Sequence, residues 1–320
     1  MPRLVVLDGH TVNPGDTSWA AFEALGELIV HPRTQPSEIV PRARGADVVI
    51  TNKTPLDAET LGRLDGLRGI CVLATGFNVV DGGHARSLGI PVCNVPRYGT
   101  ASVVEHTFAL LLELARQVGQ HDAAVHAGEW VGSPDFAFWK TPQLELSGRT
   151  LGVVGYGEIG SAVARVALAF GLRVLATPSR SRPAESGVGS AELAAVFRQA
   201  DVLSLHCPLT ADTRELVRWE RLVSMKPSAL LVNTARGGLV CEPDLARALR
   251  EGVIAGAALD VLAEEPPRPD NPLLTAPRCL LTPHLAWTSL AARERLIAVS
   301  AGNARAILEG RPANVVNPSA

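Results

Sequence analysis

The sequence predicts an α/β protein built on two doubly wound parallel sheets. Short apolar runs rich in β-branched residues alternate with amphipathic helical patterns from one end of the chain to the other, which is typical of βαβ units. The length of 320 residues corresponds to about two domains of ordinary size. Because 47% of the residues are hydrophobic, each domain can bury a sizeable core.

The expected strands fall into two series. The first comprises residues 4–7, 28–30, 48–51, 70–74 and 90–93, and the second comprises 150–154, 173–176, 202–206, 229–233, 256–260 and 279–282. Helical spacing predicts one long helix over 101–118 and another over 289–308. The second helix has no strand left to lead into, so we expect it to return to the first domain. That domain would comprise 1–99 and 286–320, with a second domain inserted at 100–285.

The composition excludes several classes of partner. Lys and Arg number 30 against 32 Asp and Glu, a formal net charge of −2, without the basic excess of a general nucleic-acid or anionic-membrane binder. No run reaches the roughly 18 apolar residues of a membrane span. The five widely spaced cysteines include no CxxC pair, which favours reduced thiols. We therefore expect a cytoplasmic protein that binds neither nucleic acid nor membrane.

A glycine-rich turn follows the first strand of the second series and precedes a helical pattern. Its residues Gly155, Gly157 and Gly160 have the spacing GxGxxG. They would permit a tight turn, a close approach to a pyrophosphate and close packing of the helix on the strand. N–H groups at the helix start, including those of Glu158 and Ile159, can hold phosphates. A tight turn without a ligand is the alternative, but the strand before and the helix after favour a Rossmann dinucleotide-binding domain.

The next strand of this domain ends without an acidic residue. An NAD-type unit has Asp or Glu about 20 residues after the glycines, bonded to the ribose 2′-hydroxyl. Here Ser179, Arg180 and Arg182 offer a hydroxyl and two guanidinium groups, a chemistry suited to a 2′-phosphate. This pattern favours NADP(H) over NAD(H). If both arginines are solvated loop residues, either cofactor could serve.

Three residues suited to acid–base chemistry follow strands of the second series. Arg236, Glu265 and His284 each come after such a strand, so we expect them at the same sheet edge as the glycine turn. Arginine can hold a carboxylate or carbonyl oxygen, histidine can exchange a proton near neutral pH, and glutamate can stabilise the imidazolium. This combination predicts chemistry on a 2-hydroxy acid.

Motifs along essentially the whole chain resemble the D-isomer-specific 2-hydroxyacid dehydrogenases, and most closely their glycerate dehydrogenase or hydroxypyruvate reductase branch. They are VLDGHTVNPGD (6–16), TNKTPL (51–56), ATGFNVVD (74–81), SVVEHTFALLL (102–112), GVVGYGEIGSAVA (152–164), HCPLT (206–210), NTARGGLV (233–240), ALDVLAEEPP (258–267) and TPHLAW (282–287). The resemblance implies a Rossmann domain inserted into a flavodoxin-like substrate domain. It also implies hydride transfer between a nicotinamide and C2 of a small D-2-hydroxy or 2-keto acid, such as hydroxypyruvate, glyoxylate or glycerate.

The same resemblance implies roles for individual residues. Arg236 would polarise the C2 oxygen and help bind the carboxylate, His284 would exchange the proton, and Glu265 would stabilise the imidazolium. Backbone N–H groups near Thr75 and Gly76 would hold the substrate. Positions along the dinucleotide would be Thr107, Cys207, Pro208, Thr213, Ala235 and Asp260. Taken alone, Cys207 could be a small buried residue and Asp260 a strand-end cap.

A few further residues have two open interpretations. Lys53 could meet substrate oxygens or be solvated, and Trp287 could wall the substrate pocket or pack at a hinge. His106 is the nearest competitor of His284 for the acid–base role. The aromatic segment around Trp139 resembles the dimer-forming region of the family and implies a homodimer. A rival to the enzyme is an NAD(P)-sensing binding protein of the corepressor type on the same fold.

Overall fold

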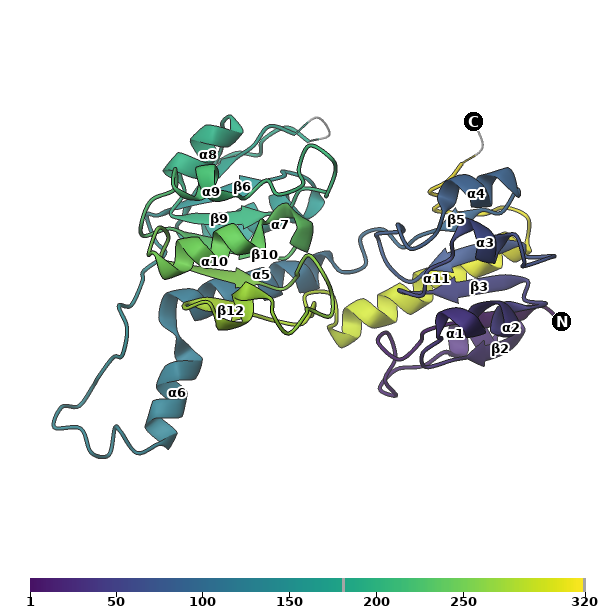
Figure 1. Cartoon of the computed structure of the whole chain (residues 1–320), viewed down its shortest axis with the longest axis horizontal. Helices are drawn as coiled ribbons and strands as arrows, with labels where there is room; N and C mark the ends of the chain where they lie inside the picture. The colour runs from purple at the N-terminus through teal and green to yellow at the C-terminus, as the bar shows by residue number, and fades with distance from the viewer. Residues whose placement is uncertain (180–181, 319–320) are drawn as a thin grey trace. The chain divides into compact units, whose positions relative to one another are not determined.

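The computed structural model describes residues 1–179 and 182–318, and in it the chain forms two compact units (Figure 1). One unit comprises Met1–Gly99 and Trp287–Ala320, and the other comprises Thr100–Ala286. Each unit contains one sheet, and the strands within both sheets pair in parallel. The predicted fold class of two parallel α/β sheets is therefore confirmed.

The sheet of the first unit has the order β2-β1-β3-β4-β5. Its strands are β1 (Arg3–Val6), β2 (Glu27–Val30), β3 (Val48–Thr51), β4 (Gly69–Val72) and β5 (Val92–Cys93). The helical segments are α1 (Ala20–Glu23), η1 (Pro36–Glu38), α2 (Ile39–Ala43), α3 (Ala58–Leu61), α4 (Gly82–Ser87) and α11 (Leu290–Leu308). Apolar residues of α2, α3 and α4 cover one face of this sheet, and those of α1 and α11 cover the other.

The close packing of α11 on this sheet depends on a glycine in β4. A Cβ added at Gly69 would lie 2.7 Å from two side-chain carbons of Ile307, so a larger residue would push the helix away from the sheet. The segment after residue 286 therefore completes the core that the first strands begin.

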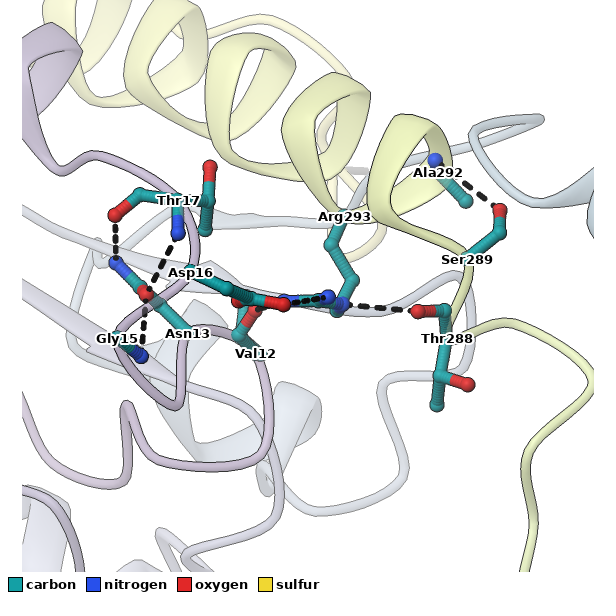
Figure 2. A network of polar contacts seen from close by, with 9 residues as sticks. All are labelled: Val12, Asn13, Gly15, Asp16, Thr17, Thr288, Ser289, Ala292 and Arg293. Carbon is teal, nitrogen blue, oxygen red and sulfur yellow. Dashed lines mark hydrogen bonds and ion pairs between the residues drawn. The ribbon is translucent and has the colours of Figure 1, made fainter.

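Arg293 in the first turn of α11 fixes the loop that follows β1, as Figure 2 shows. The buried guanidinium donates through both terminal nitrogens to the two carboxylate oxygens of Asp16, each at 2.6 Å, and also to the carbonyl of Val12 at 3.1 Å. Its Nε donates to the carbonyl of Thr288 at 2.9 Å. The hydrogen bond from Arg293 is the main reason that the pKa of Asp16 lies below its usual value. One arginine thus joins the 12–16 loop to the start of α11.

The sheet of the second unit has the order β12-β11-β10-β9-β6-β7-β8. Its strands are β6 (Thr150–Val154), β7 (Arg173–Ala176), β8 (Val188–Ser190), β9 (Val202–Leu205), β10 (Leu230–Asn233), β11 (Gly256–Leu259) and β12 (Cys279–Leu281). The helical segments are α5 (Thr100–Arg116), α6 (Val118–His126), α7 (Glu158–Ala169), α8 (Leu193–Gln199), α9 (Trp219–Leu222), η2 (Gly237–Leu239), α10 (Glu242–Arg250) and η3 (Pro272–Thr275). Helices α5 and α7 contribute to the core on one face, while α8, α9 and α10 contribute to that on the other.

The strand order reverses between β6 and β9, which are neighbours in this sheet. Ligands of open parallel sheets bind outside the carboxyl ends of the strands at such a switch point. The glycine turn follows β6 directly, so the topology places it where a dinucleotide is expected.

Some local predictions differ from the structure. Residues Val188–Ser190 pair with β7 as the edge strand β8, which neither series of expected strands included. The helix expected over 101–118 ends at Arg116, and Gln117, with a φ of 47°, separates it from α6.

In the described part of the chain, no helix is long and apolar enough to cross a membrane. All five cysteines are free, with Cys71 and Cys93 buried and the other three half-buried.

Candidate active site

The three candidate catalytic side chains come from loops after three neighbouring strands. Arg236 follows β10, Glu265 follows β11 and His284 follows β12, and the sheet has these strands in the order β12-β11-β10. Parallel strands present their carboxyl ends at one edge, so the three loops leave the sheet on the same side.

His284 and Glu265 form a short charge-assisted pair. Nδ1 of His284 donates to Oε2 of Glu265 at 2.6 Å, and Oε1 of Glu265 accepts from the backbone N–H of Leu262 at 3.0 Å. The carboxylate thereby fixes the orientation of the ring and directs its other nitrogen, Nε2, away from this bond. An imidazole held in this way can exchange a proton through Nε2.

The backbone of His284 has an unusual conformation. Its φ is 57°, in the left-handed region that costs a residue other than glycine about 1–3 kcal/mol unless the surroundings hold it there. The N–H of His284 donates to the carbonyls of Asp260 and Thr282 at 2.8 and 3.0 Å. The ring position therefore depends on the residues that fix this turn.

Asp260, just after β11, organises the turn with its buried carboxylate. Oδ1 accepts from the hydroxyl of Thr282 at 2.6 Å and the N–H of Leu285 at 2.7 Å, and Oδ2 accepts from the N–H of Ala286 at 2.9 Å. Nε2 of His106 lies 3.2 Å from Oδ1. Burial raises the pKa of Asp260, whereas the hydrogen bonds from His106, Thr282 and the two backbone groups lower it. The hydrogen bonds outweigh burial, so the pKa lies below its usual value. Asp260 is thus held as a carboxylate.

Arg236 lies in a turn that two residues overlooked in the sequence help to shape. Buried Asn233 donates through Nδ2 to the carbonyl of Arg236 and accepts from the N–H of Ala235, both at 3.0 Å. A Cβ added at Gly237 would lie 1.8 Å from the carbonyl carbon of Leu262, so only glycine fits between this turn and the loop that leads to Glu265. Both residues flank the arginine in the motif NTARGG, which is the signal that could have identified them. The Arg236 side chain is exposed.

The glycine turn combines two closely packed glycines with one open position. Gly155 has a φ of 97°, and a Cβ there would lie 2.5 Å from the backbone nitrogen of Cys207; a Cβ at Gly160 would lie 2.1 Å from the carbonyl oxygen of Gly155. By contrast, a Cβ at Gly157 would meet no described heavy atom within 4 Å. The backbone at the start of α7 is therefore open for the approach of a phosphate. Thr177, another residue that the sequence did not single out, accepts from the N–H of Gly155 at 3.0 Å.

Local hydrogen bonds or packing hold the other positions expected along a dinucleotide. Thr213 donates to the carbonyl of Pro208 at 2.7 Å, which closes the turn after β9. The hydroxyl of buried Thr107 lies 3.0 Å from that of Thr234, beside half-buried Ala235.

The thiol of Cys207 is half-buried, and burial raises its pKa. Of the helix-start residues, Glu158 accepts from the hydroxyl of Thr100 at 2.8 Å, and Ile159 packs against the core.

The segment expected to recognise the ribose is described in part. Arg180 lies outside the described residues, and Ser179 is half-buried just before it. Arg182 pairs with Glu185 at 3.4 Å, and Glu185 also pairs with Arg165 at 3.0 Å. Two guanidinium groups therefore share one carboxylate after β7.

The residues expected to contact the substrate belong to the first unit. Lys53 follows β3, and Thr75 and Gly76 follow β4, so both loops leave the same edge of that sheet. The hydroxyl of exposed Thr75 donates to the carbonyl of Val95 at 2.9 Å. Trp287 packs edge-on against Tyr98, with ring centroids 6.4 Å apart.

The loop of Lys53 is held by the carboxylate of Asp8, the first loop residue after Leu7. Asp8 accepts from the N–H groups of Asn52, Lys53 and Thr54 at 2.8, 2.5 and 2.8 Å. The hydroxyl of Thr51 adds a longer bond at 3.3 Å. Asp8 was not singled out from the sequence, although it stands in the motif VLDGHTVNPGD.

A parallel sheet that carries a glycine turn at its switch point is the architecture of dinucleotide-binding proteins. The family model for the NAD binding domain of the D-isomer specific 2-hydroxyacid dehydrogenases matches residues 108–286. The chain is 44% identical to a hydroxypyruvate reductase from Blautia hydrogenotrophica over 98% of this chain and 99% of that protein. It is 41% identical to a glycerate dehydrogenase from Methylorubrum extorquens, with 88% of each chain covered. The crystal structure of the TT0316 protein from Thermus thermophilus superposes with a TM-score of 0.86, at 38% identity, covering 98% of this chain and 99% of that one.

The chain belongs to the D-isomer specific 2-hydroxyacid dehydrogenases, within the glycerate and hydroxypyruvate branch. It is an oxidoreductase that transfers hydride between a nicotinamide cofactor and a 2-hydroxy acid.

Proposed function

We propose that this enzyme interconverts hydroxypyruvate and D-glycerate, and that it also reduces glyoxylate. The observation that carries the proposal is the 2.6 Å pair of His284 and Glu265, which joins the loops after β12 and β11 beside the loop after β10 that carries Arg236. The names of the two relatives support the choice of a small three-carbon acid. We assign the unit of residues 1–99 and 287–320 to the substrate and the unit of residues 100–286 to the dinucleotide.

The three catalytic side chains have distinct roles in this proposal. The bound nicotinamide supplies hydride to C2 of the keto acid, or accepts it in the reverse direction. His284 donates the proton from Nε2 to the C2 oxygen during reduction and removes it during oxidation. Glu265 stabilises the imidazolium through Nδ1, and Arg236 polarises the C2 oxygen and binds the carboxylate.

The remaining contacts with the substrate are assigned to the first unit. Backbone N–H groups near Thr75 and Gly76 hold the carboxylate, and the ammonium of Lys53 contacts oxygens of the acid. Trp287 limits the size of the substrate. Its edge-on packing on Tyr98 would hold the indole in place for this role.

For the cofactor, we assign pyrophosphate binding to the glycine turn. The open backbone at Gly157 supports this assignment. Further contacts along the dinucleotide come from Glu158, Ile159, Thr107, Cys207, Pro208, Thr213, Ala235 and Asp260. We favour NADP(H) over NAD(H), with Ser179, Arg180 and Arg182 around the 2′-phosphate. Arg182 is paired with Glu185, but Glu185 is also paired with Arg165. Arg182 can therefore leave Glu185 and bind the phosphate without leaving that carboxylate unpaired.

We also propose that the enzyme is a cytoplasmic homodimer that associates through the segment after α6, which extends away from the sheet of its unit in Figure 1. Val131 and Phe136 are 94% and 93% exposed, and Trp139 is 70% exposed. Such a run of exposed apolar side chains is typical of an interaction site. Sedimentation velocity should give twice the 33.7 kDa of one chain. Phe136→Ser should favour the monomer, whereas Leu274→Ser, at an exposed residue elsewhere, should not.

The function is tested by steady-state kinetics with hydroxypyruvate, glyoxylate, pyruvate and longer 2-keto acids, each with NADPH and with NADH. We expect the highest kcat/KM for hydroxypyruvate with NADPH. Arg236→Ala should lower kcat/KM by about 10³-fold, roughly 4 kcal/mol of transition-state stabilisation, while the Kd of NADPH stays nearly unchanged. Arg218→Ala, at an exposed arginine of the same unit, is the matched control.

Two outcomes would contradict the proposal. A protein that binds NADPH but turns over none of these acids would be a nucleotide-sensing binding protein instead. Equal kcat/KM with both cofactors would remove the assignment of the arginines to a 2′-phosphate.

A further inference from the structure

His106, on the helix α5, reaches the turn of His284 through a relay of hydrogen bonds. The hydroxyl of Thr282 donates to Oδ1 of Asp260 at 2.6 Å. That hydroxyl lies 3.0 Å from Nε2 of His106, and its proton is already committed to the aspartate. Nε2 of His106 must therefore carry the proton, and this N–H is shared between the Thr282 hydroxyl and Oδ1 of Asp260, which lies 3.2 Å away.

The relay converges on the atoms that fix the catalytic turn. The same oxygen of Asp260 that accepts from Thr282 also accepts from the N–H of Leu285, and the other oxygen accepts from Ala286. The His106 ring lies 3.2 Å from this carboxylate and approaches from a different element than the strand-end loops. The N–H donor of His106 therefore lies on an element that is separate from the turn it supports.

The turn requires such support because its backbone is strained. His284 keeps a φ of 57°, and its N–H is bonded to the carbonyls of Asp260 and Thr282, both of which belong to the relay. If Asp260 rotated, the N–H groups of Leu285 and Ala286 would lose their acceptor, and the turn could relax to a conformation without the left-handed residue.

We propose that His106 is a positioning residue for His284. Through Thr282 and Asp260 it holds the 282–286 segment in the shape that directs the His284 ring to Glu265. This inference adds a positioning residue to the proposed function, and its expected effect on turnover rests on that function. The effect on the shape of the turn stands independently of the reaction.

The experiment compares three variants with the wild-type protein. His106→Leu removes the donor, His106→Gln replaces it with an amide donor, and His126→Leu is a control at an exposed histidine of the same unit. We would measure amide hydrogen exchange without ligand, together with kcat, the KM of hydroxypyruvate and the Kd of NADPH.

His106→Leu should speed exchange of the Leu285 and Ala286 amides by about tenfold or more and leave exchange in β10 unchanged. It should lower kcat by about tenfold or more, with smaller changes in KM and Kd. His106→Gln should restore most of both properties, and His126→Leu should match the wild type.

Several results would overturn the inference. They are unchanged exchange at Leu285 and Ala286 in His106→Leu, a uniform rise in exchange that includes β10, and no recovery in His106→Gln. If the wild-type protein turned over no keto acid, the proposed function would fail, and the exchange data would still decide whether His106 holds the turn.

Discussion

Asp8 in one unit and Asp260 in the other both hold a neighbouring loop with a carboxylate, but the two carboxylates differ in burial. Each follows a parallel strand, and each carboxylate gathers backbone N–H groups of a neighbouring loop: three N–H groups from residues 52–54 for Asp8, and those of Leu285 and Ala286 for Asp260. Asp8 is half-buried, whereas Asp260 is buried and also bonded to Thr282 and His106. The more buried carboxylate, with the larger number of donors, is thus the one that holds the turn of His284.

The comparison predicts the largest effect for Asp260→Asn. The amide nitrogen cannot accept, so the N–H of Leu285 or of Ala286 loses its acceptor, which should lower the free energy of unfolding by about 1–3 kcal/mol. Displacement of the His284 turn should lower kcat by about 10²-fold. Chemical denaturation and steady-state kinetics measure the two effects. A variant with wild-type kcat would show that the turn does not need the carboxylate.

The pH dependence of this variant gives a second test. The pKa of Asp260 in the folded protein lies below its usual value of 3.8, so the carboxylate contributes stability above that pH. The contribution is lost as the pH falls through the lower, folded pKa. The difference in unfolding free energy between the wild type and Asp260→Asn should therefore be full at neutral pH and shrink under acid conditions. A difference that grows on acidification would contradict the sign.

A smaller effect is expected for Asp8→Asn. Here the carboxylate is closer to solvent, and water can replace a lost bond, so the free energy of unfolding should fall by about 0.5–1.5 kcal/mol. The loop of Lys53 should loosen, which would raise the KM of hydroxypyruvate by up to about tenfold with little change in kcat or in the Kd of NADPH. If this variant lost as much kcat as Asp260→Asn, the distinction between the two carboxylates would be wrong.

The sequence was sufficient for features that repeat along the chain or stand in a short motif. The alternation of strands and helices predicted two parallel sheets, and the strands expected over 229–233, 256–260 and 279–282 led us to expect three catalytic candidates at one edge. The resemblance to the family implied that Glu265 stabilises the imidazolium of His284, and the two residues form a hydrogen bond in the structure, where β11 and β12 are neighbours.

The rest depends on contacts between residues distant in the sequence. His106 and Thr282 are 176 positions apart, and no local pattern indicates that they meet. In the sequence Gly237 resembles any glycine in a turn. The requirement for glycine comes from the backbone of Leu262, which lies too close for a Cβ. The strand β8 has the sequence Val-Gly-Ser, which has little strand propensity of its own, and it forms through pairing with β7. Such features are determined by tertiary packing.

The long helix α11 has a consequence for the order of events during synthesis. Its apolar residues complete the core beside β1, β3 and β4, yet it is translated after the whole intervening unit. Until it leaves the ribosome, that face of the first sheet is covered by α1 without α11, and Asp16 lacks Arg293. Domains generally fold as units during synthesis. The nucleotide-binding unit, whose residues are contiguous, therefore has everything it needs to fold first, and the unit that contains the first strand is finished last.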